Sequence, residues 1–170
     1  MTGTKLSVTK NCCNYMKYKK LFLSLGITLL TGSVAGIATA NAINTWYSSL
    51  NKPYFNPPNW LFAPVWTLLY VLMGIALYLV WKLPRSADRN RAITIFFVQL
   101  TLNFLWSFIF FSMQQTGWAF AEIVLLLIAI LACIYFFEPL SKPATWLMLP
   151  YAAWVTFASV LNYSIWMLNK

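Results

Sequence analysis

The sequence predicts an all-α protein, a bundle of five membrane-spanning helices with a long structured loop between the first and the second. Hydrophobic residues make up 61% of the 170 positions and charged residues only 9%, whereas a soluble domain usually carries about 25% charge. Five apolar segments also reach the length of about 20 residues that a spanning helix needs. With so few charges the chain cannot cover a water-facing surface, so lipid is its natural solvent.

The apolar segments are separated by residues that end helices. Leu83-Pro84-Arg85 and the stretches 114–117 and 138–143 carry proline, glycine, amide or charged residues. Because these three connections are short, we expect the helices that each one joins to be antiparallel neighbours. The length fits about one domain, which we divide into a basic N-terminal tail, 1–19, and a transmembrane domain, 20–170. The predicted spans are 20–43, 62–81, 92–113, 117–137 and 144–168, and residues 44–61 form a candidate lid.

The basic residues sort by side of the membrane in this arrangement. One side collects ten of the 12 Lys and Arg residues and the other collects two. Because cytoplasmic loops are enriched in these residues, the asymmetry places the N-terminus inside and the C-terminus outside. The short tail, without an amphipathic Arg- and Ser-rich leader, favours a bacterial cytoplasmic membrane. The ten are Lys5, Lys10, Lys17, Lys19, Lys20, Lys82, Arg85, Arg89, Arg91 and Lys142, and the two are Lys52 and Lys170.

The N-terminal region has a second interpretation. Lysines, an apolar stretch and then Ala38-Thr39-Ala40 resemble a signal peptide with a small-residue cleavage site. The apolar stretch is longer than in most such peptides, and Gly32 and Gly36 form a small-xxx-small pattern that lets helices pack closely in lipid. We therefore favour retention, which keeps five helices, whereas cleavage would leave four.

Several reaction classes lack their usual residues in this chain. There is no histidine, which is the commonest general base and metal ligand and the usual haem ligand. Cys12, Cys13 and Cys133 show no metal-ligand spacing, and the first two are too close for an ordinary disulfide. No Ser–base pair or paired carboxylates are found. We expect no conventional catalytic site, metal or cofactor, and we interpret the net charge of +9 as a topology signal rather than a sign of nucleic-acid binding.

The loop of residues 44–60 is the most unusual part of the sequence. Its prolines Pro53, Pro57 and Pro58 restrict the backbone and forbid a continuous helix. A stiff loop at a membrane edge is suited to be a lid over a pocket, but an interfacial belt of aromatic residues is the alternative. Both stay open on the residues alone. The aromatic residues in question are Trp46, Tyr47, Tyr54, Phe55 and Trp60.

Three polar and aromatic stripes run along the predicted helices. Each stripe has spacings of three or four residues, which puts its members on one helix face. Amides in lipid need hydrogen-bond partners, so we expect Gln99, Asn103 and Asn162 to face the bundle interior. Interhelical packing and a ligand cavity are both compatible with this pattern. The stripes are Trp66 with Tyr70, then Gln99 with Asn103 and Trp106, then Trp154 with Ala158 and Asn162.

Three stretches together carry a specific combination of residues. The first is Trp46-Tyr47-x-x-Leu50-x-Lys52-Pro53-x-x-x-Pro57-Pro58-x-Trp60-x-Phe62-x-Pro64-Val65-Trp66. The others are Gln99-x-x-x-Asn103-x-x-Trp106-Ser107 and Pro150-Tyr151-x-x-Trp154-x-x-Phe157-Ala158-x-x-Leu161-Asn162. Over roughly residues 20–168 the chain resembles the TspO/MBR family of tryptophan-rich sensory proteins, which includes the mitochondrial translocator protein (peripheral benzodiazepine receptor). The number and order of the spans and the long first loop fit as well.

The resemblance implies a ligand cavity inside the bundle. Aromatic faces would stack on a flat porphyrin and a few polar groups would orient it, and Ala158 would leave room for it. The resemblance also implies a homodimer, although Gly32 and Gly36 are equally compatible with packing within one chain. A sterol is a second ligand class, but the motif Leu161, Tyr163, Lys170 misses the strict sterol pattern by one residue. The implied ligand-binding residues are Tyr47, Pro57, Trp66, Tyr70, Asn103, Trp106, Trp154, Ala158 and Leu161.

Three functions follow from these observations. The leading hypothesis is a membrane protein that binds, transports or senses porphyrins or similar lipophilic ligands. The alternative, implied by the resemblance, is light- and oxygen-dependent porphyrin degradation in which Trp66 and Trp154 take part. A third is ion-coupled export, which needs buried ionisable residues. Only Glu122 is placed for that role, and it lies near enough to a helix end to reach the interface, whereas Asp88 and Glu138 are expected to be solvated surface charges.

Overall fold

The computed structural model describes the backbone of residues 3–170 and the side chains of residues 18–37 and 39–170. This part of the chain is helical and contains no strand, which confirms the predicted all-α class. A short helix interrupts the first loop, and a π-helical turn ends the third long helix. The elements are α1 (Gly3–Ile43), α2 (Trp46–Ser49), α3 (Asn59–Trp81), α4 (Ala87–Ser107), η1 (Phe108–Ser112), α5 (Thr116–Phe137) and α6 (Lys142–Leu168).

Five of the described helices are long and apolar enough to cross a membrane, as predicted. Among the stretches that meet this criterion, the first of which is Tyr18–Ile43, the start that differs most from prediction is that of α4, at Ala87 rather than at residue 92. Helix α1 itself begins earlier than its span, at Gly3. Ser86 caps this helix, and its Oγ accepts a hydrogen bond from the backbone N–H of Arg89 at 3.1 Å. Because this cap satisfies a backbone donor of the first turn, the helix can begin among charged residues, before the apolar span starts.

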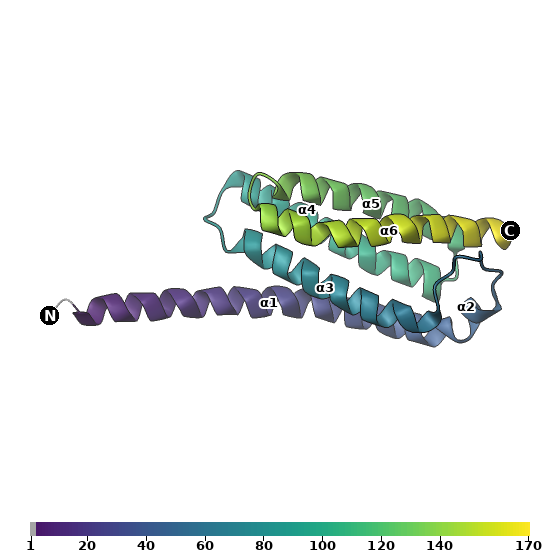
Figure 1. The fold of residues 1–170 in the computed structure, drawn as a ribbon, viewed down its shortest axis with the longest axis horizontal. Helices are drawn as coiled ribbons and strands as arrows, with labels where there is room; N and C mark the ends of the chain where they lie inside the picture. The colour runs from purple at the N-terminus through teal and green to yellow at the C-terminus, as the bar shows by residue number, and fades with distance from the viewer. Residues whose placement is uncertain (1–2) are drawn as a thin grey trace.

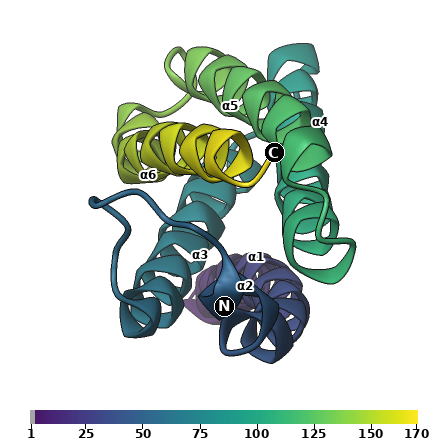
Figure 2. The ribbon, with the colours of Figure 1, turned by 90° about the vertical axis from the view of Figure 1, so that its right-hand side faces the viewer.

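The long helices form a ring in the order α1, α3, α6, α5, α4 (Figures 1 and 2). Consecutive helices α4 and α5, and α5 and α6, are close neighbours, as their short connections predict. Helices α3 and α4 approach each other less closely, and they meet through side chains across the ring, at Tyr70 with Asn103 and at Trp66 with Trp106. Figure 2 shows α1 between them at the bottom of the ring, with α4 continuing into η1 against α1. Short loops therefore fix antiparallel direction, but helix packing decides which helices touch.

The two ends of the bundle differ in character. The first loop and the C-terminus lie at one end, and the 82–86 and 138–141 connections lie at the other (Figure 1). At the second end, Lys20 Nζ donates a hydrogen bond to the carbonyl of Trp81 at 3.1 Å. The direction of the bundle across the membrane stays a prediction, as does the division into tail and domain. The side chains of Cys12, Cys13 and the first three lysines lie outside the described residues.

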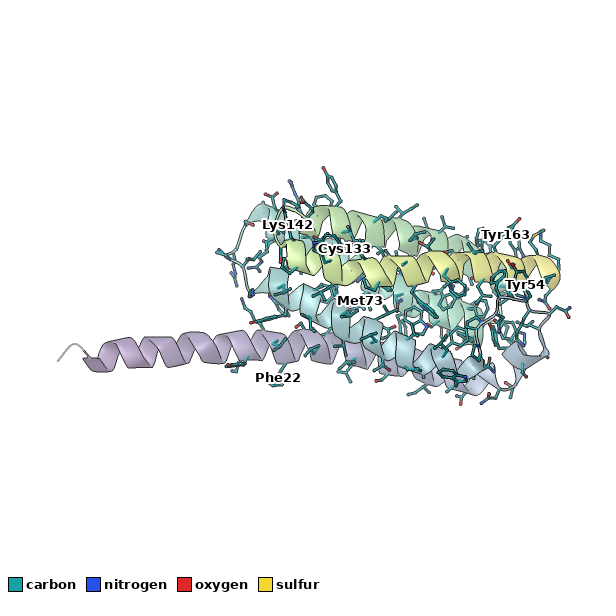
Figure 3. All side chains as sticks on the ribbon, viewed as in Figure 1. Phe22, Tyr54, Met73, Cys133, Lys142 and Tyr163 are labelled. Carbon is teal, nitrogen blue, oxygen red and sulfur yellow. The ribbon has the colours of Figure 1, made fainter. Side chains whose placement is uncertain are left out.

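The outer surface is apolar and the interior is tightly packed. Phe22 is 71% exposed on α1, whereas Met73 and Cys133 are fully buried between helices (Figure 3). Helices α1 and α3 approach each other closely at Gly74, where a Cβ atom would lie 3.1 Å from the Leu25 Cα atom and 2.7 Å from Thr28 Oγ1. Small residues at such crossings let two backbones come together in lipid, where packing drives association.

We expect Gly74→Ala to destabilise the bundle, because its methyl group would press on backbone as well as on side chains of α1. Overpacking of this kind costs about 1–3 kcal/mol, so the thermal midpoint in detergent should fall. Gly26→Ala is the matched control, since no atom lies within 4 Å of the position its Cβ would take. An equal melting temperature for both variants would show that the close α1–α3 approach does not limit stability.

Candidate functional site

The first loop folds over the end of the bundle on a buried tyrosine. Tyr47, on α2, is 1% exposed, and its hydroxyl donates a hydrogen bond to Asn56 Oδ1 at 2.6 Å. Burial raises the pKa of Tyr47 to about 12, so the phenol stays neutral and able to donate at physiological pH. Pro57 is buried as well, whereas Tyr54 and Trp60 are 100% and 71% exposed. The loop is thus partly a cover and partly an exposed aromatic rim.

Two asparagines tie this loop to the last helix. The backbone N–H of Asn51 donates to Asn169 Oδ1 at 2.9 Å, and Asn169 Nδ2 donates back to the carbonyl of Asn51 at 2.9 Å. We call this pair the Asn51–Asn169 bridge. Since it joins residues 118 apart in the chain, it holds the cover at the C-terminal end of α6. Both partners are exposed, so water can compete for these bonds.

Under the loop, aromatic side chains from α2, α3, α4, η1 and α6 pack against one another. Trp66 and Trp106 are stacked with ring centroids 6.4 Å apart and planes at 30°. Trp106 in turn stacks on Phe110 at 5.3 Å, and Tyr47 meets Phe62 edge-on at 6.1 Å. These offset and edge-to-face contacts are the favoured geometries for aromatic pairs. The aromatic cluster consists of Tyr47, Phe62, Trp66, Trp106, Phe110, Phe111 and Trp154.

The π-helical turn η1 explains how two consecutive phenylalanines both join the cluster. Phe110 and Phe111 are 2% and 5% exposed, and the backbone N–H of Met113 bonds to the carbonyl of Phe108, five residues back, at 3.0 Å. The wider turn rotates the helix face, so neighbouring residues can both point inward. Such turns are rare and occur frequently at functional sites.

A polar chain crosses the interior beside the aromatic cluster. The Tyr70 hydroxyl donates to Asn103 Oδ1, and Asn103 Nδ2 donates to the Tyr151 hydroxyl at 3.0 Å. Farther along, Trp106 Nε1 donates to Asn162 Oδ1 at 3.1 Å. The expectation that the three amides face the interior is confirmed, because Gln99, Asn103 and Asn162 are at most 1% exposed. These bonds join α3, α4 and α6.

Some buried polar atoms have no hydrogen-bond partner among the described residues. Both carboxylate oxygens of Glu122 are in this state, as are Gln99 Oε1 and Trp154 Nε1. Glu122 is 8% exposed, so its side chain is packed inside the bundle; its closeness to the membrane interface stays a prediction. Asp88 and Glu138 are exposed, as predicted.

Two cavities adjoin the aromatic cluster and differ greatly in size. A narrow space of about 20 Å³ lies inside the cluster. A larger cavity of about 380 Å³ lies between α1, α3 and the end of α4, and we call it the lateral cavity. Four aromatic residues line both spaces, so the two are separated only by aromatic side chains. They are Phe62, Trp66, Trp106 and Phe111.

Comparison with known proteins matches this architecture to one family. The model of the TspO/MBR family matches residues 24–167. The chain belongs to the TspO/MBR family. It is 44% identical to the tryptophan-rich protein TspO of Archaeoglobus fulgidus over 154 residues, which cover 91% of this chain and 99% of the relative. It is 38% identical to the human translocator protein over 123 residues, 71% and 73% of the two chains, and 34% identical to the tryptophan-rich sensory protein of Cereibacter sphaeroides over 148 residues, 86% and 92%.

The structure gathers most of the residues predicted for ligand binding in this TspO/MBR chain. Six of the nine line the narrow space: Tyr47, Trp66, Trp106, Trp154, Ala158 and Leu161. Tyr70 lines the lateral cavity together with Trp66 and Trp106. Asn103 and Pro57 line neither space; Asn103 instead positions Tyr70 and Tyr151, and the Pro57 carbonyl accepts a bond from Asn56 Nδ2 at 3.0 Å. Their part in binding any ligand stays a prediction.

The lateral cavity of this TspO/MBR member was not predicted from the sequence, although the α1 residues that line it include the small-xxx-small pattern. Gly32 and Gly36 of α1 line it. A Cβ atom at Gly32 would lie 2.3 Å from the Tyr70 ring, whereas one at Gly36 would meet nothing within 4 Å. Gly32 therefore packs within the chain, and Gly36 leaves open space. The small-residue pattern indicated close helix packing but not that its two glycines border a cavity.

We expect Asn169→Ala to loosen the first loop, because it removes both side-chain bonds of the Asn51–Asn169 bridge. Amide hydrogen exchange over residues 47–56 should become faster, while exchange in α3 stays unchanged. Ser164→Ala is the control, since its hydroxyl bonds only within α6, to the carbonyl of Val160. Equal exchange in both variants would mean that Tyr47 and its neighbours hold the loop without the bridge.

Proposed function

We propose that this protein binds flat, lipophilic molecules inside its helix bundle, porphyrins foremost, and acts in their transport or sensing. The observation that supports this most is the Trp66–Trp106 pair, which walls both the narrow space and the lateral cavity. Large aromatic faces favour stacking on a planar ring system. Ligand pockets typically measure about 300–1,000 Å³ and are lined mostly by apolar groups, and the lateral cavity, at about 380 Å³, falls in that range.

Orientation of the ligand depends on the few polar groups beside the aromatic faces. Trp154 Nε1 is a buried donor without an acceptor among the described residues, and it belongs to a side chain that lines the narrow space. A donor in an apolar site gains most from an acceptor that enters with the ligand, since leaving it unpaired is costly. We propose that it orients an oxygen or nitrogen acceptor of the bound molecule.

A porphyrin ring needs more room than the narrow space offers. At about 20 Å³ this space holds little more than a single water molecule. Binding there therefore requires that the aromatic side chains separate or that the first loop lifts. The exposed Asn51–Asn169 bridge favours lifting of the first loop, because water can readily replace the hydrogen bonds of the bridge. Sterols are the second proposed ligand class.

The names of relatives support the same class of function. One relative is called a tryptophan-rich sensory protein and others translocator proteins.

Light-driven porphyrin degradation is the second candidate function, because Trp66 and Trp154 both line the space in which a porphyrin would be held. It requires light and oxygen, so a ligand that stays intact in the dark and is consumed only under illuminated, aerobic conditions would support it.

We expect protoporphyrin IX to bind saturably to the purified protein in detergent in the dark. Trp66→Phe and Trp154→Phe should each weaken binding about two- to tenfold, because an aromatic pair contributes about 0.5–1.5 kcal/mol. The porphyrin's own absorption band is the better readout, since it does not change when a tryptophan is removed.

Trp118→Phe is the matched control for this titration, because that tryptophan is 73% exposed on the bundle surface. A linear response without saturation, or equal weakening in all three variants, would mean that the porphyrin only partitions into the micelle. Porphyrin binding inside the bundle would then be wrong.

We also propose that the basic end of the bundle faces the cytoplasm. A cysteine at Tyr54, which is 100% exposed, should then react with a membrane-impermeant maleimide on intact cells. A cysteine at the exposed Arg85 should react only after permeabilisation. Both changes are made in a chain with Cys12→Ser and Cys13→Ser, while Cys133 is fully buried and can remain. The reverse labelling pattern would place the N-terminus outside.

A further inference from the structure

A groove runs along the outside of the bundle between residues 27–34 of α1 and 97–104 of α4, and we call it the α1–α4 groove. Its volume is about 450 Å³, and it shares no lining residue with the lateral cavity or the narrow space. The hydroxyls of Thr31 and Thr101 in its lining are bonded to carbonyls four residues back in their own helices, each at 2.9 Å. The groove therefore presents an apolar surface to lipid.

Each wall of this groove continues to a cation at the basic end of the bundle. On α1, Lys20 lies seven residues before Ile27, and on α4, Arg89 lies eleven residues before Leu100. Seven and eleven residues are close to two and three full helical turns, so each cation lies on the same helix face as the groove residue that follows it. Both helices run away from the basic end (Figure 1), so the two cations lie toward the same end of the groove.

The two cations also meet at the end of α3. Lys20 Nζ donates a hydrogen bond to the carbonyl of Trp81, and Arg89 Nη1 donates one to the carbonyl of Leu83, each at 3.1 Å. The Cα atoms of Trp81 and Leu83, two residues apart in the chain, lie within about 7 Å of each other. Arg89 is 8% exposed, and its Nε has no hydrogen-bond partner among the described residues. Two positive groups from different helices therefore converge on one turn.

No carboxylate of the described residues balances these two charges. Neither Lys20 nor Arg89 forms an ion pair there, since Asp88 pairs instead with the exposed Arg91 at 3.8 Å. A cation that is removed from water without a counter-charge is costly, and two cations close together repel. An anion that contacts both would relieve the two costs at once. A phosphate suits this position, because a guanidinium group presents a planar fork of donors that matches its oxygens.

The cations and the groove lie at the depths of a phospholipid's headgroup and tail. Lys20 is near the start of the candidate span Tyr18–Ile43, and Trp81 ends the span Asn59–Trp81, so both lie at an edge of the membrane. The groove extends from about 10 to about 21 Å farther along α1 than Lys20, at a rise of 1.5 Å per residue. Half of the hydrocarbon core is about 15 Å thick. The tail of a lipid whose headgroup contacts Lys20 therefore reaches the groove.

We propose that the α1–α4 groove and the Lys20–Arg89 pair together bind one anionic phospholipid, with its phosphate at the two cations and an acyl chain along the groove. A neutral lipid would leave the two charges unbalanced. A second copy of the chain fits less well, because a two-fold contact through this groove would bring two sets of the same cations toward each other. The site lies outside the bundle and does not depend on the proposed binding of porphyrins.

Native mass spectrometry of the full chain in a non-ionic detergent tests this site. The protein is titrated with dioleoyl phosphatidylglycerol and, separately, with dioleoylglycerol, which has the same chains without the phosphate. The fraction of chains that carry one lipid gives a dissociation constant for each. Lys20→Gln removes one cation but keeps an amide that can donate to the Trp81 carbonyl. Lys142→Gln is its matched control, since this exposed lysine on α6 gives the same change in net charge.

A second pair of variants tests the groove. Val34→Trp places a large side chain in the groove, which Val34 lines. Val160→Trp is its matched control on α6, because the two valines are 52% and 53% exposed and Val160 lines none of the spaces described above.

We expect the parent protein to bind phosphatidylglycerol more tightly than dioleoylglycerol. Lys20→Gln should weaken phosphatidylglycerol about fivefold, the effect of about one cation at a membrane surface, and leave dioleoylglycerol unchanged. Val34→Trp should weaken both lipids, and the two control variants neither.

Three results would overturn the proposal. Equal losses in Lys20→Gln and Lys142→Gln would mean that only the net charge attracts the lipid. Unchanged binding of phosphatidylglycerol in Val34→Trp would mean that its acyl chain does not occupy the groove. A dimer in the same spectra that is lost in Val34→Trp, while phosphatidylglycerol still binds, would assign the groove to a second copy of the chain.

Discussion

The structure depends on one constraint, that lipid offers no hydrogen bonds to the polar groups of a spanning helix. The chain meets it by turning its amides inward and pairing them across helices. Asn103 joins Tyr70 to Tyr151, and Asn162 joins Trp106 to the carbonyl of Thr116 at 2.8 Å. Because three of these four bonds also fix an aromatic ring, of Tyr70, Tyr151 or Trp106, the interactions that hold the bundle together also determine where these aromatic faces lie.

The sequence was sufficient for the five spans and for the inward amides, because both follow from local composition and helical spacing. It was also sufficient to single out most of the residues that surround the narrow space. It was not sufficient for the order of helices around the ring, where α1 separates α3 from α4, since packing against distant segments decides that order. Nor did it indicate η1, because a π-helical turn depends on the competition between two hydrogen-bonding patterns that differ little in sequence preference.

The π-helical turn helps to explain why the two cavities differ in volume. By bringing Phe110 and Phe111 inward it fills the centre of the bundle, so only about 20 Å³ stays open among the predicted ligand-binding residues. The open volume lies instead beside α1, where glycine has no side chain and alanine only a methyl group to fill it. A spacing analysis identifies residues that share a face, but it does not show whether their side chains leave room between them. That depends on the rotamers and volumes of all the packed neighbours.

Besides the hydrogen-bonded amides, the bundle interior holds polar atoms that have no hydrogen-bond partner among the described residues. In a bundle that pairs Asn103 and Asn162 so completely, an unpaired buried group is an exception that costs stability. Trp154 Nε1 belongs to a side chain that lines the narrow space within the aromatic cluster. Gln99 Oε1 and Glu122 line neither cavity, so a ligand there cannot compensate them, and Gln99 has only a weak contact from Nε2 to Met73 Sδ at 4.0 Å. Trp154 Nε1 is therefore the exception that a bound molecule can relieve, and the free energy that this donor does not contribute to folding becomes available for binding.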